Sequence, residues 1–218
     1  MNAKVFVLGR PGSGKSTAAR YINQLATQQG WSTRHINDYD ILKRMFLEDV
    51  EHKKFLPTAN NGFDAIDLTV LDTALQEVEQ LVEATFTQTN LVTIEFARND
   101  YAQALEQFSP DFLQDAYFLF LDVDIDTCLQ RVHARVEHSN SIDDHPSFSD
   151  DIFRIYYNKD NRLYMSYYLQ KEFAIRKPIQ LIENIRSLPH FLSQVSQFTR
   201  MIFQQEEFLL TPIYVLAD

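Results

Sequence analysis

The sequence predicts an α/β domain in which helices cover both faces of a parallel β-sheet. Two observations support this class: short apolar segments alternate with amphipathic helical patterns, and a glycine-rich loop joins the first apolar segment to the first helix. Strands that alternate with helices form parallel sheets, because each return connection is a helix that packs on the sheet. A chain of 218 residues is long enough for one such domain with its own core.

The predicted strands are short apolar segments bounded by turn signals, a pattern typical of buried strands. They cover residues 4–8, 32–36, 91–96, 117–123 and 178–182. The predicted helices cover residues 15–29, 41–55, 66–86, 101–108, 126–136, 152–173 and 188–203. Residues 57–62 form a predicted loop, and the polar segment 137–150 is expected to be a mobile surface loop. The pattern of residues 204–218 assigns no element to them.

The net charge of the chain limits its partners. It is −10, from 20 basic and 30 acidic residues. This acidic balance argues against a surface that binds polyanions, so nucleic acid is not an expected partner. A small anionic substrate remains compatible with it, because a few local arginines can build one positive pocket.

Cysteine content and hydropathy limit the environment of the protein. The single cysteine, Cys128, excludes an internal disulfide framework and a zinc cluster built on cysteines. No segment has the length and apolar character of a membrane span, and the first residues do not form a signal peptide. We therefore expect a cytoplasmic location and no membrane partner.

The most specific motif lies between the first strand and the first helix. Residues 9–16 read Gly9-Arg10-Pro11-Gly12-Ser13-Gly14-Lys15-Ser16, the phosphate-binding P-loop pattern G-x-x-x-x-G-K-S. Glycines allow the backbone to wrap around a phosphate at positive φ, and successive N–H groups then point inward. The start of the helix adds unpaired N–H groups and the positive end of its dipole. The motif predicts a nucleoside triphosphate site; the alternative is a glycine-rich turn that matches by chance.

The residue types of this motif assign roles. Lys15 is expected to reach the β- and γ-phosphates, and the Ser16 hydroxyl is expected to bind Mg²⁺. The expected cofactors are therefore ATP and Mg²⁺. The predicted nucleotide-binding residues of the loop and helix start are Gly9, Arg10, Pro11, Gly12, Ser13, Gly14, Lys15, Ser16 and Thr17.

A second stretch carries a family resemblance. Residues 120–135 read Phe-Leu-Asp-Val-Asp-Ile-Asp-Thr-Cys-Leu-Gln-Arg-Val-His-Ala-Arg and resemble strand four and the lid helix of the adenylate-kinase-like P-loop kinases. This family includes nucleotide, deoxynucleoside, shikimate and gluconate kinases. The resemblance implies a three-layer P-loop fold with a five-stranded parallel sheet, order 2-3-1-4-5, and a lid after strand four. It also implies one kinase domain, residues 1–218, with an acceptor-binding region at about 37–86 and a lid region at about 131–165.

Two arginines of this stretch are candidate catalytic residues. Arg131 and Arg135 are four residues apart and share one face of the predicted helix. By resemblance, they would face the transferring phosphoryl group and neutralise its charge, as an arginine finger does. The alternative is a solvated helix face paired with Glu137 or Asp126.

The third strand ends in Thr93-Ile-Glu95-Phe-Ala-Arg98, and ligands of parallel sheets gather at the carboxyl ends of strands. By resemblance, Glu95 could accept the proton of the acceptor hydroxyl or hold a water molecule of Mg²⁺. Arg98 could bind a phosphate of the acceptor or donor. The spacing Glu-x-x-Arg departs from the Glu-Arg of deoxynucleoside kinases, and a surface salt bridge is the alternative.

The second strand ends in Asn37-Asp38-Tyr-Asp40, which resembles the Asp-x-Asp of shikimate kinase. A carboxylate here can orient a substrate hydroxyl or remove its proton, so Asp38 and Asp40 are candidate substrate-binding residues. Asp38 could also support Mg²⁺ through water, and Asp40 could instead cap the following helix. Glu95 and Asp38 both remain candidates for the catalytic base. Asn184, after the fifth strand, occupies the position where related kinases contact adenine.

These motifs predict an ATP- and Mg²⁺-dependent phosphotransferase that acts on a small hydroxyl or phosphate acceptor, with a nucleoside or nucleotide as first candidate. One alternative is a kinase for polynucleotide 5′ ends, which the net charge of −10 disfavours. Another is a nucleotide-binding regulatory ATPase or switch, although the sequence lacks the N-K-x-D of GTPases and the Asp-Glu strand end of motor ATPases. The aromatic-rich second half could supply a homodimer interface, and the oligomeric state stays open.

Overall fold

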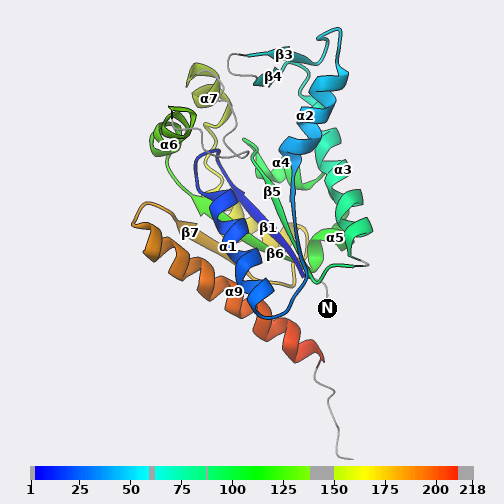
Figure 1. The fold of residues 1–218 in the computed structure, drawn as a ribbon, viewed down its shortest axis with the longest axis vertical. Coiled ribbons are helices and arrows are strands. Elements are labelled where there is room, and N and C mark those ends of the chain that lie inside the picture. The colour runs from blue at the N-terminus through cyan, green and yellow to red at the C-terminus, as the bar shows by residue number, and fades with distance from the viewer. Residues whose placement is uncertain (1–2, 59–61, 87, 138–149, 211–218) are drawn as a thin grey trace, which may run out of the picture.

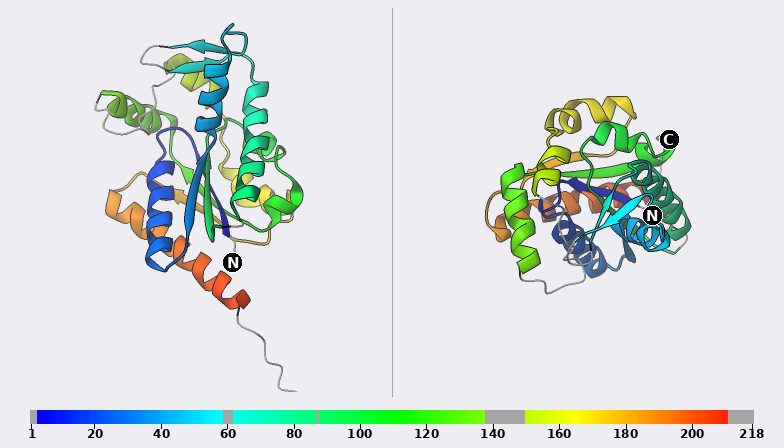
Figure 2. Two further views of the ribbon diagram at one scale, coloured as in Figure 1. Left: turned by 45° about the vertical axis from the view of Figure 1, so that its right-hand side comes forward. Right: turned by 90° about the horizontal axis from the view of Figure 1, so that it is seen from above.

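The computed structural model describes residues 3–58, 62–86, 88–137 and 150–210. Its centre is a five-stranded sheet with helices on both faces (Figures 1 and 2). All strand pairs of this sheet are parallel, in the order β2-β5-β1-β6-β7, which is 2-3-1-4-5 when only these strands are counted. This confirms the predicted fold. The strands are β1 (Ala3–Gly9), β2 (Thr33–Asn37), β5 (Leu91–Phe96), β6 (Ala116–Asp122) and β7 (Ile179–Glu183).

The strands form where predicted because both faces of the central strands are buried. In β1, Phe6 and Leu8 contribute to the core on one face, whereas Val5 and Val7 contribute to the core on the other. All six residues of β5 are buried. Strands covered on both sides require continuous apolar runs, and these runs are what the sequence displays.

Helices α1 (Lys15–Gln28) and α9 (Leu188–Leu210) cover one face of the sheet. Ile22 of α1 and Phe198 of α9 belong to the same buried cluster as the strand residues of that face. Among the helices of the part of the chain that the structure describes, none is long and apolar enough to cross a membrane.

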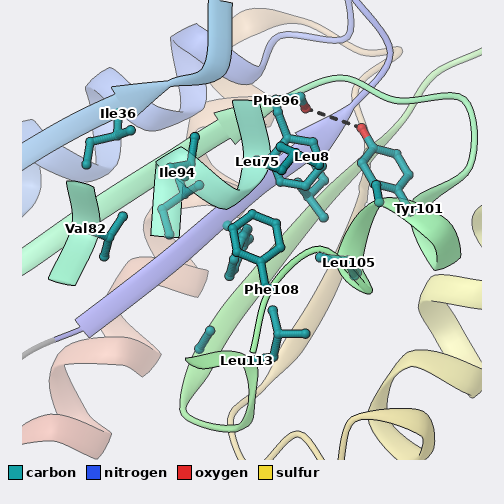
Figure 3. Packing of buried hydrophobic residues seen from close by; sticks show 14 of the residues in the cluster. Leu8, Ile36, Leu75, Val82, Ile94, Phe96, Tyr101, Leu105, Phe108 and Leu113 are labelled. Carbon is teal, nitrogen blue, oxygen red and sulfur yellow. Dashed lines mark hydrogen bonds between the residues drawn. The ribbon is translucent and has the colours of Figure 1, made fainter. Parts of the chain in front are cut away.

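The opposite face carries a larger, aromatic core. Figure 3 shows Leu75, Phe96 and Phe108 among the side chains that form one buried cluster with Leu8 of the central strand. Phe6 stacks on Phe118 with ring centroids 4.9 Å apart. The elements that supply this core are α2 (Asp38–Glu48), α3 (Thr69–Thr85), α4 (Tyr101–Leu105), α5 (Pro110–Gln114), a π-helical turn (Tyr164–Tyr168) and α8 (Leu169–Glu172).

The predicted helix 41–55 is wrong at both ends. The helix α2 begins at Asp38, because the Asn37 side chain accepts a hydrogen bond from Tyr39 N and caps it. It ends at Glu48, because the Asp49 carboxylate accepts three backbone N–H groups of residues 53–55 and turns the chain. An unpredicted hairpin of β3 (Phe55–Pro57) and β4 (Phe63–Ala65) follows.

The predicted helix 152–173 is interrupted. The chain forms α7 (Asp150–Tyr156), then leaves helical geometry until residues 162–163, which lead into the π-helical turn described above. The backbone carbonyls of Tyr157 and Lys159 accept hydrogen bonds from the Arg10 guanidinium, so they are not available to a continuing helix. The preceding helix α6 (Ile125–Glu137) matches its prediction, and most of the predicted loop 137–150 lies outside the described residues.

Candidate functional site

The P-loop connects β1 to α1 and requires glycine at two close approaches. Gly12 has φ 83° and Gly14 has φ 103°, values that residues with a Cβ rarely adopt. A Cβ on Gly12 would overlap the backbone carbonyl oxygen of Cys128 in α6. A Cβ on Gly14 would lie 2.5 Å from Nδ2 of Asn184, just after β7. The loop is therefore held tightly between α6 and the end of β7.

The start of α1 is open to a ligand. Its N-cap is Gly14, and no side chain of the described residues caps it. The first N–H groups of a helix have no partner within the helix, so an uncapped start favours an anion. Lys15 is buried beside it, and its Nζ donates to the Arg10 carbonyl oxygen at 3.1 Å. Burial lowers the pKa of Lys15, and the charge of Glu95 opposes this shift.

One cavity of about 810 Å³ joins the P-loop to the ends of β2 and β5, the β3–β4 hairpin, α6 and α7. All of these elements lie at the carboxyl end of the sheet (Figure 1). The predicted site residues that line this cavity are Pro11, Gly12, Gly14, Lys15, Ser16, Thr17, Asp38, Glu95, Arg98, Arg131, Arg135 and Asn184. The predicted residues that are not part of its lining are Gly9, Arg10, Ser13 and Asp40.

Glu95 lies next to the predicted magnesium ligand. The Ser16 hydroxyl donates to Glu95 Oε1 at 2.8 Å, and His35 Nε2 lies 3.1 Å from Glu95 Oε2. Burial alone would raise the pKa of Glu95, but His35 and the charge of Lys15 more than offset it, so the pKa is lowered. The result is a buried carboxylate beside a hydroxyl, and hard cations such as Mg²⁺ prefer oxygen ligands of this kind.

Arg98 pairs with Asp38 and not with Glu95. Its Nη1 donates to Asp38 Oδ2 at 2.6 Å, and its two Nη groups also donate to the carbonyl oxygens of Ala97 and Leu71. Both partners are about 7% exposed or less, so the surface salt bridge considered for this strand end is wrong. Burial raises the pKa of the Asp38 carboxyl, and the Arg98 charge opposes the shift.

The two arginines of α6 have different surroundings. Arg131 Nη2 donates to the Asn184 carbonyl oxygen at 2.7 Å, and its Nη1 lies 3.5 Å from the Gly12 carbonyl oxygen. Arg135 Nε is buried and has no hydrogen-bond partner among the described residues. The pairing of these arginines with Asp126 is not observed, because Asp126 pairs with Arg154 at 2.5 Å. The side chain of Glu137 lies outside the described part of the chain.

Two predicted residues turn away from the cavity. The Arg10 side chain donates to the carbonyl oxygens of Val123, Tyr157 and Lys159, at 3.1, 2.9 and 2.7 Å. Asp40 is exposed in the first turn of α2. Capping by Asp40 is wrong, because Asn37 is the N-cap.

Two residues that contact the site, Tyr101 and His35, were not predicted from the sequence. Each contacts a site residue that is distant from it in the chain. The buried Tyr101 hydroxyl accepts the Gly9 N–H at 2.7 Å and lies 3.1 Å from the Gly9 carbonyl oxygen, so it fixes the start of the P-loop. His35 touches Glu95 from the neighbouring strand. Neither residue belongs to a motif, and Tyr101 is 92 positions from Gly9, so no local signal could have indicated these contacts.

Comparisons with known proteins agree with this geometry. A family model described as "AAA domain" matches residues 5–148, about two thirds of the chain. A comparison with curated protein sequences found no match. The APS kinase of Mycobacterium tuberculosis, solved in complex with AMPPNP and APS, is 15% identical with a TM-score of 0.56, over 93% of this chain and 98% of that chain. Shikimate kinase from Acinetobacter baumannii, in complex with shikimate, is 16% identical with a TM-score of 0.51, over 94% and 95%.

These two structural matches show a shared fold and confirm the predicted resemblance to small-molecule P-loop kinases at that level. The family match covers the P-loop, the strands up to β6 and the helix α6. The chain therefore belongs to the AAA domain family of P-loop proteins, and it has the fold of the small-molecule P-loop kinases.

Proposed function

We propose that the protein is an ATP- and Mg²⁺-dependent phosphotransferase that phosphorylates a hydroxyl group of a small acceptor. One observation gives the main support for this proposal. A single cavity connects the uncapped start of α1, with Lys15 beside it, to the buried pair of Asp38 and Arg98. Phosphoryl transfer needs a cationic cradle for the donor and a polar group for the acceptor within reach of each other.

The donor half of the cavity fits a triphosphate. Lys15 is buried without a carboxylate bonded to its Nζ in the described residues, and Arg135 Nε is buried without a partner there. A buried cation such as Lys15 is costly unless an anion approaches it, and the buried N–H of the half-buried Arg135 likewise favours an acceptor. Together with the uncapped helix start, they match the charge that a triphosphate would bring.

Ser16 and Glu95 fit a divalent cation. Their oxygen atoms are 2.8 Å apart, line the same cavity, and supply a hydroxyl and an ionised carboxylate. Mg²⁺ binds through one or two such groups and keeps several waters. When bound, it would neutralise charge on the phosphates. Ser16 would then be a direct ligand, and Glu95 would hold a coordinated water molecule.

Asp38 is the better candidate for the catalytic base. Glu95 is already engaged by Ser16 and His35, and its lowered pKa makes it a weak proton acceptor. The pKa of Asp38 is raised by burial, and its carboxylate lines the cavity. The acceptor hydroxyl would give its proton to Asp38 while its oxygen forms a bond to the γ-phosphorus. The bond from this phosphorus to the β–γ bridging oxygen would break, and its electron pair would leave with ADP.

Arg98 and Arg131 would act as positioning residues. Arg98 orients Asp38 through the 2.6 Å hydrogen bond. Arg131 joins the Gly12 carbonyl to the Asn184 carbonyl, and Asn184 Nδ2 donates to the Ser13 carbonyl at 2.8 Å. This network holds the P-loop against the segment after β7, where the adenine of a bound nucleotide would lie by resemblance.

A nucleotide-binding regulatory ATPase is the second candidate, and the description of the matching family model as an AAA domain favours it. Motor ATPases of that kind carry an acidic pair after an apolar strand. Here β5 carries Glu95 followed by Phe96, and β6 ends at Asp122 before Val123. These strand ends favour the kinase.

A coupled assay of ADP release distinguishes the two candidates. We expect ADP release in Mg²⁺ buffer to rise when the correct hydroxyl compound of a metabolite panel is added, and phosphate to appear on that compound. Lys15→Ala should abolish turnover, whereas Lys171→Ala, an exposed lysine of α8 outside the cavity, should not change it. ADP release that no acceptor stimulates, with free phosphate as the product, would favour the regulatory ATPase. Turnover by a folded Lys15→Ala variant at the wild-type rate would reject both.

A further inference from the structure

The acceptor half of the cavity is the wall built by its lining residues within 37–58 and 62–71 and by α7. In the described part of this wall, the charged side chains are Asp38 and Asp64, and neither lysine nor arginine contributes. The cations of the cavity come from other elements, namely Lys15, Arg20, Arg98, Arg131, Arg135 and Arg186. The acceptor half is therefore acidic, in contrast to the donor half.

The charge of Arg98 does not make the acceptor half cationic. Its charge is matched by Asp38 at 2.6 Å, and its Nη groups are bonded to Asp38 and to two carbonyl oxygens. Its Nε alone is buried without a hydrogen-bond partner among the described residues. One N–H group suits a neutral oxygen such as a hydroxyl. A phosphate or carboxylate would need a second, unmatched charge.

The same wall exposes apolar and aromatic surface. Leu56, Ile66, Leu68 and Ile152 are between 45% and 56% exposed, and all four line the cavity. Large apolar side chains left exposed around a cavity indicate a ligand or partner that covers them.

Aromatic rings lie beside these side chains. Tyr39 and Phe63 stack with ring centroids 5.5 Å apart and planes inclined by 18°, and both line the cavity. Tyr156 of α7 lines it as well. Phe63 also stacks on Phe46 with ring centroids 4.9 Å apart, so these rings already pack on one another. The aromatic surface that they leave on the cavity favours a planar ligand, because offset or edge-to-face contacts add to the free energy gained by burying area.

Asp64 supplies the polar recognition element of this wall. It lies in the middle of β4, and its Oδ1 is buried without a hydrogen-bond partner in the described residues. Burial raises the pKa of this carboxyl. A buried acceptor atom without a partner is costly, so a ligand N–H or a ligand cation that reaches it would be favoured.

We propose that the acceptor is an uncharged or cationic hydroxyl compound that carries a planar ring and an N–H donor, and that Asp64 recognises this donor. This inference rests on the proposed phosphotransferase function, because it names the substrate class of the same cavity. The class includes nucleosides and those hydroxymethyl heterocycles that carry an amino group or a ring N–H, and it excludes their phosphorylated or carboxylated counterparts.

Calorimetric titration of the full chain without ATP tests the proposal with matched pairs of probes. The pairs are the four common ribonucleosides with their 5′-monophosphates, and aminopyridinemethanols with the corresponding aminopyridinecarboxylates. We expect at least one uncharged member to bind at least about tenfold more tightly than its anionic counterpart. Asp64→Asn should weaken that binding about tenfold, because the amide oxygen can still accept the N–H but no longer carries the charge that strengthens the hydrogen bond.

Asp72→Asn is the matched control, because Asp72 is exposed on α3 and does not line the cavity. It should leave acceptor binding unchanged, and both variants should keep the wild-type affinity for ATP. Tighter binding of the anionic members, no binding of any ring compound, or equal behaviour of the two variants would overturn the proposal. If ring compounds bind as expected but none is phosphorylated in the presence of ATP and Mg²⁺, the proposed function fails while the ligand class stands.

Discussion

Arg98 donates a 2.6 Å hydrogen bond to the carboxylate of Asp38, 60 residues earlier in the chain, and both side chains are buried. The pair joins the end of β5 to the start of α2 at the wall of the cavity. An arginine neutralised in this way orients a carboxylate and does not provide a free phosphate site. Its position therefore separates the proposed acceptor half of the cavity from the proposed donor half around Lys15.

Replacement of Asp38 tests its role as the base. Asp38→Asn keeps the shape and one hydrogen-bond acceptor for Arg98 but cannot take a proton. We expect turnover to fall about 10²- to 10⁴-fold, the usual contribution of general-base catalysis. Calorimetry should show unchanged ATP affinity, because Asp38 belongs to the acceptor half. Turnover within twofold of wild type would assign the base to another group.

The two arginines of α6 should differ in their effects. Arg135→Gln removes a guanidinium whose Nε has no partner in the described residues, so we expect turnover to fall about 10³-fold, as for an arginine finger. Its ADP affinity should stay close to wild type. Arg131→Gln should weaken ADP and ATP binding equally, because Arg131 holds the Gly12 and Asn184 carbonyls. Identical kinetic and binding profiles for the two variants would contradict this division.

Gly12 should be far less tolerant of a side chain than Gly30. Both residues have positive φ, 83° and 81°, so an alanine is strained by about 1–3 kcal/mol at either position. At Gly12 the new Cβ would overlap the Cys128 carbonyl, whereas at Gly30 nothing lies within 4 Å of the new Cβ. Urea denaturation should therefore show a larger loss of unfolding free energy for Gly12→Ala than for Gly30→Ala. ATP binding should be lost in Gly12→Ala alone. Equal losses of stability would refute the tight contact between the P-loop and α6.

The lowered pKa of Glu95 predicts how stability depends on pH. A carboxyl group with a folded-state pKa below its unfolded value stabilises the protein at any pH above the unfolded value of about 4.3. That contribution is lost as the pH falls from this value through the lower folded-state pKa. Wild type should therefore lose more unfolding free energy than Glu95→Gln across this acidic window, measured by urea denaturation at a series of pH values. If the unfolding free energies of the two proteins fall equally as the pH is lowered, the carboxylate is not stabilised by His35 and Lys15.

Local patterns predicted the sheet and the P-loop well, since both depend on neighbouring residues. The strand β5 was predicted at its observed bounds, because all of its six residues are buried and apolar runs identify such strands. The glycine motif likewise places Lys15 and Ser16 without reference to the rest of the fold.

The remainder of the site depends on contacts between distant residues. The pairing of Asp38 with Arg98 and the approach of His35 to Glu95 span 60 positions, and a single sequence gives no sign of either. The break after α7 has the same origin, because Arg10 of the P-loop takes the carbonyls of Tyr157 and Lys159. The short β3–β4 hairpin was missed because strands of three residues have no measurable periodicity.

One guanidinium, that of Arg10, fastens the turn that would surround the phosphates to the segment that ends the acceptor wall. The two proposed halves of the cavity are consequently linked through this side chain. Ordering of the turn by a bound nucleotide would also fix the Tyr157 side of the neighbouring compartment, so occupancy of one would prepare the other before any chemistry begins.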